Sequence, residues 1–194
     1  MHLLLVRRRF LQGFQLLLVL ACLWAGAVRG QGVELAALQT RREDGALTLD
    51  FAARVTLPPA VEDALQRGVP IYFAAEARLL RSRWYWRDER VARVSRSWRV
   101  AYQPLTNTWR VGLGGLHQTF DTLNEALGAA SRSAGWKLAE LASLDPDSRY
   151  TVEFSYRLDT SQLPGPMQFG LGALGSQGEW AVGVARVLQV EPGP

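Results

Sequence analysis

Residues 69–103 read VPIYFAAEARLLRSRWYWRDERVARVSRSWRVAYQ, and this stretch decides the fold. Two runs, Val69–Trp86 and Val91–Gln103, flank the short charged segment Arg87–Arg90. Apolar side chains recur at every second position from Ile71 to Leu79 and, interrupted by Arg96, from Ala92 to Tyr102, which is the period of a half-buried strand. The pattern therefore predicts a long β-hairpin. The apolar phase slips near Leu79–Leu80, which predicts a β-bulge at that point.

Further strands are predicted on both sides of this hairpin. Leu47–Leu57 and Tyr150–Leu158 alternate apolar with polar residues, and the second of these is the clearest strand of the chain. Pro104–Asn107 has the composition of a turn, so the chain is expected to return along Thr108–Val111. Trp180–Val190 is the expected last strand.

Helical signals are few and short. Prolines open a helix within Pro58–Gly68, whose glycine fits the position just after a helix. Apolar spacing predicts a second helix over Phe120–Ala130 and a further short one over Trp136–Leu144. Gly112–Gly115 predicts a loop that also contains His117. We therefore expect a mainly β (α+β) protein, with an antiparallel sandwich-like or meander sheet, a long central hairpin and two or three short helices.

The first thirty residues have the three parts of a secretory signal peptide. Arg7–Arg9 form a basic start, Leu11–Ala27 form an apolar stretch, and small residues follow. We expect cleavage after Ala27 or Gly30, leaving residues 31–194 as a single exported β-rich domain.

Two alternatives stay open for this leader. The apolar stretch lies at the lower end of the length that spans a bilayer, so a retained membrane anchor is the competing interpretation. The run Arg7–Leu11 also fits a twin-arginine signal, although ordinary secretory leaders are basic too.

Composition excludes several classes of protein. Of 22 Lys and Arg residues, four lie in the leader, so the rest of the chain has 18 basic and 18 acidic residues. This balance excludes a nucleic-acid-binding protein recognised by bulk charge. Cys22 is the only cysteine and lies in the leader, and His117 is the only histidine after it. Neither a disulfide framework nor a usual zinc or copper site is therefore expected, and no cofactor motif is present.

The hairpin has an unusual concentration of arginine and aromatic residues. Residues 76–103 contain eight arginines and only three acidic residues, and tryptophan and tyrosine are interleaved with the arginines. Arginine and tryptophan often anchor interfaces, and guanidinium groups bind carboxylate and phosphate. We expect a docking surface made of Arg83, Trp84, Trp86, Arg87, Arg90 and Trp98. The expected partner is an acidic protein or an anionic envelope lipid or glycan, because export separates the chain from nucleic acids.

Two other interpretations remain. The arginines and tryptophans could stack on one another simply to cover the sheet. Alternatively, Glu76 or Asp88 could serve as the acid/base of an enzyme that acts on envelope glycan or lipid. Binding is favoured over catalysis because arginine-rich surroundings usually lower a carboxyl pKa, and no catalytic residue is assigned.

Several stretches together resemble a family of exported Gram-negative proteins catalogued as domain of unknown function 4390. The matching stretches are GVPIYF at 68–73, RWYWRD at 83–88, Y-x-P-L-T-x-x-W at 102–109, F-x-T-L-x-E-A-L at 120–127 and L-P-x-P at 163–166. The resemblance implies an envelope location and one domain, without an established activity or site. It also implies that the ectodomain of a membrane sensor kinase is a conceivable partner, because similar proteins are encoded beside such kinases.

Overall fold

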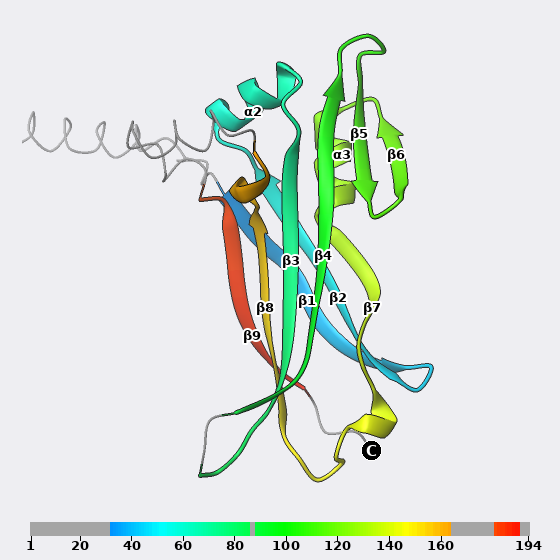
Figure 1. Ribbon diagram of the computed structural model, residues 1–194, viewed down its shortest axis with the longest axis vertical. Helices are drawn as coiled ribbons and strands as arrows, with labels where there is room; N and C mark the ends of the chain where they lie inside the picture. The colour runs from blue at the N-terminus through cyan, green and yellow to red at the C-terminus, as the bar shows by residue number, and fades with distance from the viewer. Residues whose placement is uncertain (1–31, 86–87, 164–180, 191–194) are drawn as a thin grey trace, which may run out of the picture. The chain divides into compact units, whose positions relative to one another are not determined.

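The chain folds into two antiparallel β-sheets in a computed structural model that describes residues 32–85, 88–163 and 181–190. The larger sheet has six strands in the order β6-β5-β4-β3-β8-β9, and the smaller has the order β1-β2-β7. Figure 1 shows β1 and β2 crossing behind the long strands of the larger sheet, with β7 on the β2 side. This arrangement confirms the mainly β, antiparallel class. The expected leader, residues 1–30, lies outside the described residues.

All neighbouring strands in both sheets pair antiparallel. In chain order, the elements are β1 (Gly32–Glu43), β2 (Ala46–Thr56), α2 (Pro59–Gln66), β3 (Ile71–Arg81), β4 (Glu89–Gln103), β5 (Thr108–Leu113), β6 (Leu116–Phe120), α3 (Leu123–Ala130), β7 (Arg132–Glu140), η1 (Leu141–Ser143), β8 (Tyr150–Leu158), η2 (Thr160–Gln162) and β9 (Gly183–Val190). Among the described residues, no helix is both long and apolar enough to cross a membrane.

The predicted hairpin lies at the centre of the larger sheet. β3 pairs antiparallel with β4 over the whole length of β3, and the register shifts between Leu79 and Leu80, as the apolar phase predicted. β8 pairs with the other edge of β3, so both edges of that strand are hydrogen-bonded. The inward-facing residues of β3, from Ile71 to Leu79, are at most 1% exposed. The hairpin is therefore the structural centre of the domain.

Aromatic side chains join the two sheets. The ring centroid of Phe51 on β2 lies 4.9 Å from that of Phe154, 5.5 Å from that of Tyr156 and 5.9 Å from that of Trp98. Phe73 of β3 stacks on Tyr156 at 5.4 Å. These contacts place one core between the inner faces of the sheets, as in a β-sandwich.

The ends of α2 lie where the sequence predicted them, whereas α3 begins at Leu123, later than the predicted helix over Phe120–Ala130, because Phe120 ends β6. Pro59 begins α2, and Gly68 follows it with a φ of +87°, which only glycine adopts easily. Thr122 and Glu125 form a reciprocal capping box at the start of α3, which packs on β5, β4, β2 and β6. This helix therefore contacts strands of both sheets.

The expected helix over Trp136–Leu144 is wrong. Residues 132–140 form β7, followed by the short turn η1. Trp136 and Leu138 are buried while Lys137 between them is exposed, which is a strand pattern. A short apolar run fits helix and strand spacing equally well, and pairing with β2 selects the strand.

The expected loop after Gly112 is shorter than predicted. β5 continues to Leu113, Gly114 and Gly115 form the turn, and His117 lies on β6 rather than in a loop. The strand β1 was not predicted, because its residues are mostly half-buried or exposed and its pairing with β2 is what defines it. The predicted last strand is confirmed as β9, although Trp180 is outside the described residues.

Candidate binding surfaces of the six-stranded sheet

The tip of the β3–β4 hairpin exposes aromatic rings. Trp84 is 93% exposed and Tyr85 is 67% exposed, and their rings meet edge to face at 4.9 Å. Side chains of this size usually lie in a core, so two adjacent exposed rings are uncommon. Trp86 and Arg87, which were predicted to belong to the same surface, lie outside the described residues.

Glu89, at the base of the tip, neutralises two of the arginines there. Glu89 accepts hydrogen bonds from both Arg81 and Arg83. The hydrogen bonds from Arg81 and then Arg83 lower the pKa of Glu89, so the carboxylate is charged at neutral pH. Arg83 is therefore an ion-paired residue, whereas Arg90 has no carboxylate within 4.0 Å among the described residues.

A second cluster neutralises the middle of the outer face of the larger sheet. Glu76 pairs with Arg93 at 2.8 Å and with Arg78 at 3.4 Å, and Arg78 also reaches Glu153 at 3.3 Å. The hydrogen bond from Arg93 lowers the pKa of Glu76, although partial burial opposes it. A carboxyl held ionised in this way is a weak general acid, so the geometry does not favour Glu76 as a catalytic residue.

Two residues of the hairpin serve the core instead of the surface. Arg96 places its guanidinium 5.3 Å from the Trp136 ring centre and donates to Ser133 Oγ at 2.6 Å, both on β7. Burial lowers the pKa of Arg96. Trp98 is 3% exposed and packs on Phe51 of the opposite sheet. Because its side chain faces inward, Trp98 does not belong to the docking surface in which it was expected.

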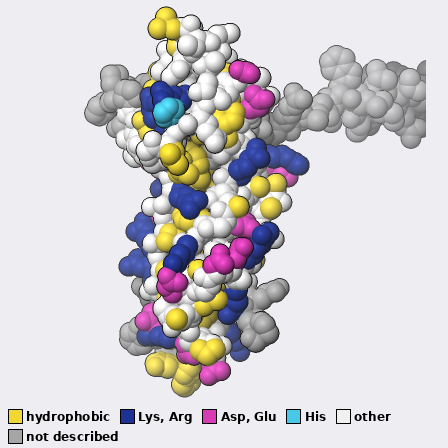
Figure 2. All heavy atoms as spheres, turned by 90° about the vertical axis from the view of Figure 1, so that its right-hand side faces the viewer, with side chains coloured by type: hydrophobic (Ala, Val, Ile, Leu, Met, Phe, Trp, Pro, Cys, Tyr) yellow, Lys and Arg dark blue, Asp and Glu magenta, His cyan; other side chains and the backbone are white. Residues whose placement is uncertain are grey.

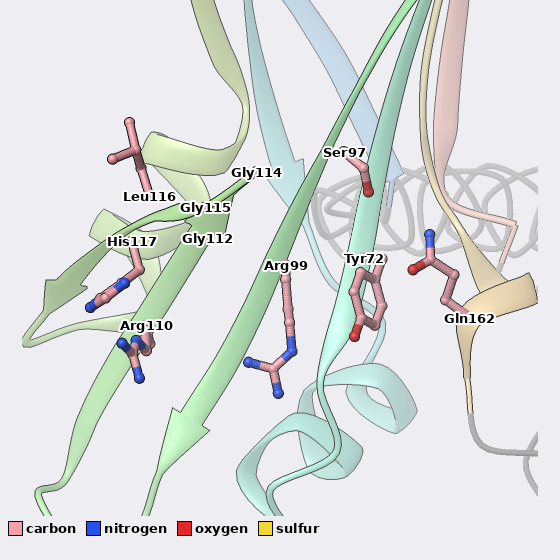
Figure 3. A pocket seen from close by; sticks show the side chains of 10 residues that line it. All are labelled: Tyr72, Ser97, Arg99, Arg110, Gly112, Gly114, Gly115, Leu116, His117 and Gln162. Atoms are coloured by element: carbon pink, nitrogen blue, oxygen red, sulfur yellow. The ribbon is translucent and has the colours of Figure 1, made fainter.

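A concave basic region lies on the outer face near the start of β3. We call it the basic hollow, a space of about 420 Å³ at the surface (Figure 3). It is lined by the side chains of Tyr72, Ser97, Arg99, Arg110, Leu116, His117 and Gln162, and by Gly112, Gly114 and Gly115. No acidic residue lines it among the described residues.

Strand register brings the lining of the basic hollow together. Tyr72 pairs with Arg99, Arg99 with Gly112, and Gly112 with His117, so four strands form one row across the sheet. Arg110 lies two residues before Gly112 on the same face of β5. Figure 3 shows Arg99 and Arg110 on neighbouring strands with Tyr72 beside Arg99 and His117 beside Arg110.

The two arginines of the basic hollow differ from Arg81 and Arg83 of the tip, which are both paired with Glu89. Neither Arg99 nor Arg110 has a carboxylate within 4.0 Å in the ranges that the structure describes. On the side of the domain seen in Figure 2, the cyan histidine lies against dark blue side chains, whereas dark blue and magenta are mixed farther down. The structure therefore separates a basic region from a neutralised one.

Sequence reasoning counted Arg99 with the hairpin but missed its neighbours. Arg110 lies beyond the turn at residues 104–107, and His117 was expected in a loop. The signal was present in the turn itself, since a tight turn there pairs Arg99 with Gly112 and places Arg110 on the same face. Nowhere in the described ranges does a group of three His, Cys, Asp or Glu residues gather to hold a metal.

The fold and these surfaces define a class of protein: a two-sheet antiparallel β domain whose larger sheet has an arginine-rich outer face. The sequence profile of the family described as "Domain of unknown function (DUF4390)" matches residues 30–186. The chain belongs to this family, as the resemblance predicted. No curated protein and no solved structure matches the chain.

Proposed function

We propose that this protein is exported to the periplasm and acts there as an accessory module that docks onto an acidic partner protein. Export is supported by the basic start, apolar stretch and small-residue exit of the first thirty residues. An ectodomain of a membrane sensor kinase would suit as the partner, as the family resemblance implies. The module acts by binding and not by catalysis.

The exposure of Trp84 and Tyr85 at the hairpin tip is the observation that carries the docking proposal. The two rings restrain each other through their edge-to-face contact, so less conformational freedom is lost on binding. Tryptophan and tyrosine are also the side chains that most often dominate the energy of protein interfaces.

Charge near the tip selects an acidic partner. Arg81 and Arg83 share Glu89, and Arg90 is exposed without a carboxylate nearby in the described part of the chain. With Asp88 included, the described charges of the tip are three arginines, Arg81, Arg83 and Arg90, against two carboxylates, Asp88 and Glu89, so the tip stays net positive. An acidic face would be attracted to this end of the hairpin, and salt would weaken the attraction.

Site-specific photocrosslinking in living cells tests the docking proposal. A photoreactive amino acid replaces Tyr85 in the full chain, and the same amino acid replaces Leu105 in a control. Leu105 is fully exposed in the turn at the opposite end of β4, so it matches Tyr85 in exposure but not in place. We expect one discrete protein adduct from position 85 and none of that mass from position 105.

Further variants decide what the adduct means. Trp84→Ala and the double variant Arg83→Glu/Arg90→Glu should each reduce the yield of the adduct at least several-fold. An equal yield from these variants, or the same adduct from position 105, contradicts docking through the tip. If the adducts contain only lipid or glycan, the hairpin tip binds the envelope surface and not a partner protein. Recovery of the untagged protein in the cytoplasm with Met1 still present would contradict export.

A further inference from the structure

We propose that the basic hollow is a separate binding site for a phosphate-bearing ligand, with Arg99 and Arg110 as its anion-binding residues. The site is independent of the hairpin tip. Tyr72 is at the beginning of β3, and the tip follows Arg81 at its end, so roughly 30 Å of strand separate them. Either proposal can therefore fail without the other.

Uncompensated charge is the first argument for a ligand. Most arginines of the hairpin have a partner: four are ion-paired with Glu76, Glu89 or Glu153, and Arg96 stacks on Trp136. Arg99 and Arg110 sit on the same outer face without such a partner among the described residues. Asp159, which precedes η2, accepts hydrogen bonds from Ser161 and from Gln162. Two guanidinium groups are thus left to bind an anion from solution.

The shape of the basic hollow is the second argument. Gly112 lies between Arg99 and His117 in the cross-strand row, where any other residue would place a side chain on the same face. A Cβ built at Gly112 would lie 3.7 Å from the nearest atom, so neither crowding nor its backbone conformation requires glycine. The missing side chain keeps the space between the two arginines and the histidine open.

The donor set favours phosphate over carboxylate. A phosphate monoester has about 1.5 to 2 negative charges at neutral pH and three acceptor oxygens. Two guanidinium groups balance that charge and offer forked donors, and the hydroxyl groups of Tyr72 and Ser97 add further donors. A single carboxylate would leave one guanidinium group without a counter-charge. The volume, about 420 Å³, suits a small ligand or a headgroup.

Calorimetric titration of the full chain with inorganic phosphate and with glycerol 3-phosphate tests the site. We expect saturable binding of at least one probe, weakened about tenfold or more by Arg99→Gln and by Arg110→Gln. Gly112→Val should abolish binding while keeping every charge, because valine suits a strand and fills the hollow. The control is Arg54→Gln, which removes an equal charge from an exposed arginine of the smaller sheet and should bind as the wild type does.

Vesicles distinguish the two sources of phosphate. Vesicles of phosphatidylcholine containing phosphatidic acid should capture the protein, with the same dependence on Arg99 and Gly112, if a lipid headgroup is the ligand. Binding of the small probes without vesicle capture assigns a free phosphorylated ligand. The proposal is overturned if neither probe nor vesicle binds, if the Gly112→Val variant binds normally, or if Arg54→Gln weakens binding as much as Arg99→Gln. Unfolding midpoints of the variants, measured by urea denaturation, exclude misfolding as the cause of lost binding.

Discussion

Position along the hairpin decides what each aromatic residue does. Trp84 and Trp98 belong to the same arginine-rich segment, yet one is 93% exposed and the other is 3% exposed. Trp98 faces inward on β4 and is closed off by Phe51 of the opposite sheet, whereas Trp84 lies beyond the last residue of β3. Residue type alone therefore does not distinguish an anchor of the core from an anchor for a partner.

At the residue scale, the buried hydroxyl of Tyr156 is expected to stabilise the fold. It donates a hydrogen bond of 3.0 Å to the carbonyl oxygen of Ala130, at the end of α3, and burial raises the pKa of the phenol. Tyr156→Phe would leave that carbonyl without its partner. We expect the free energy of unfolding to decrease by about 1–2 kcal/mol, measured by urea denaturation.

Tyr85→Phe is the matched control for this variant, because Tyr85 is 67% exposed and loses only contact with water. Its unfolding free energy should stay within about 0.5 kcal/mol of the wild type. Equal stability of both variants would show that the Tyr156 hydrogen bond contributes nothing to folding.

At the scale of elements, ion pairs stabilise the centre of the larger sheet above acidic pH. Arg93 holds the pKa of Glu76 below its ordinary value of 4.5. A carboxyl with a lowered pKa in the folded state stabilises the fold above its unfolded-state pKa, and this contribution is lost as the pH falls through the folded-state pKa. We expect the free energy of unfolding to decrease between about pH 5 and pH 3, and to decrease less in Glu76→Gln.

Urea denaturation at a series of pH values measures this difference. Glu34→Gln provides the control, since its carboxylate lies 4.0 Å from Arg54 and both side chains are about three-quarters exposed. That variant should keep the pH dependence of the wild type. If Glu76→Gln keeps it as well, the pairs on β3 and β4 do not contribute to stability.

At the scale of the whole molecule, the contact between the sheets is expected to dominate stability. Phe51 is the β2 residue whose ring meets three aromatic rings of the larger sheet. Phe51→Ala removes these contacts and leaves a cavity between the sheets. We expect it to lower the free energy of unfolding by about 3–5 kcal/mol in urea denaturation.

Leu105→Ala, at a fully exposed apolar residue, is the comparison for Phe51→Ala and should change stability by less than about 0.5 kcal/mol. A small loss in Phe51→Ala would mean that each sheet is stable without the other. The two proposed binding surfaces lie on the larger sheet, so their variants should leave this core contact intact.

Much of the fold could be read from local patterns. Alternation of apolar and polar residues identified β2, β3, β4 and β8, because a strand with one buried face must repeat every second residue. Prolines and glycine marked the ends of α2 for reasons of backbone conformation. β7 was misjudged, because a short apolar segment takes its structure from the strand beside it.

The sequence by itself determined the strands of the hairpin, the bulge between Leu79 and Leu80, and the abundance of arginine on it. Only the tertiary structure decided which arginines are neutralised, because an ion pair depends on which residues lie across from each other on neighbouring strands. Pairing of β4 with β5 and of β5 with β6 brought Arg99, Arg110 and His117 into one hollow. The spacing of these residues along the chain does not predict the pairing register, because the register follows from turn geometry and from the packing of two sheets.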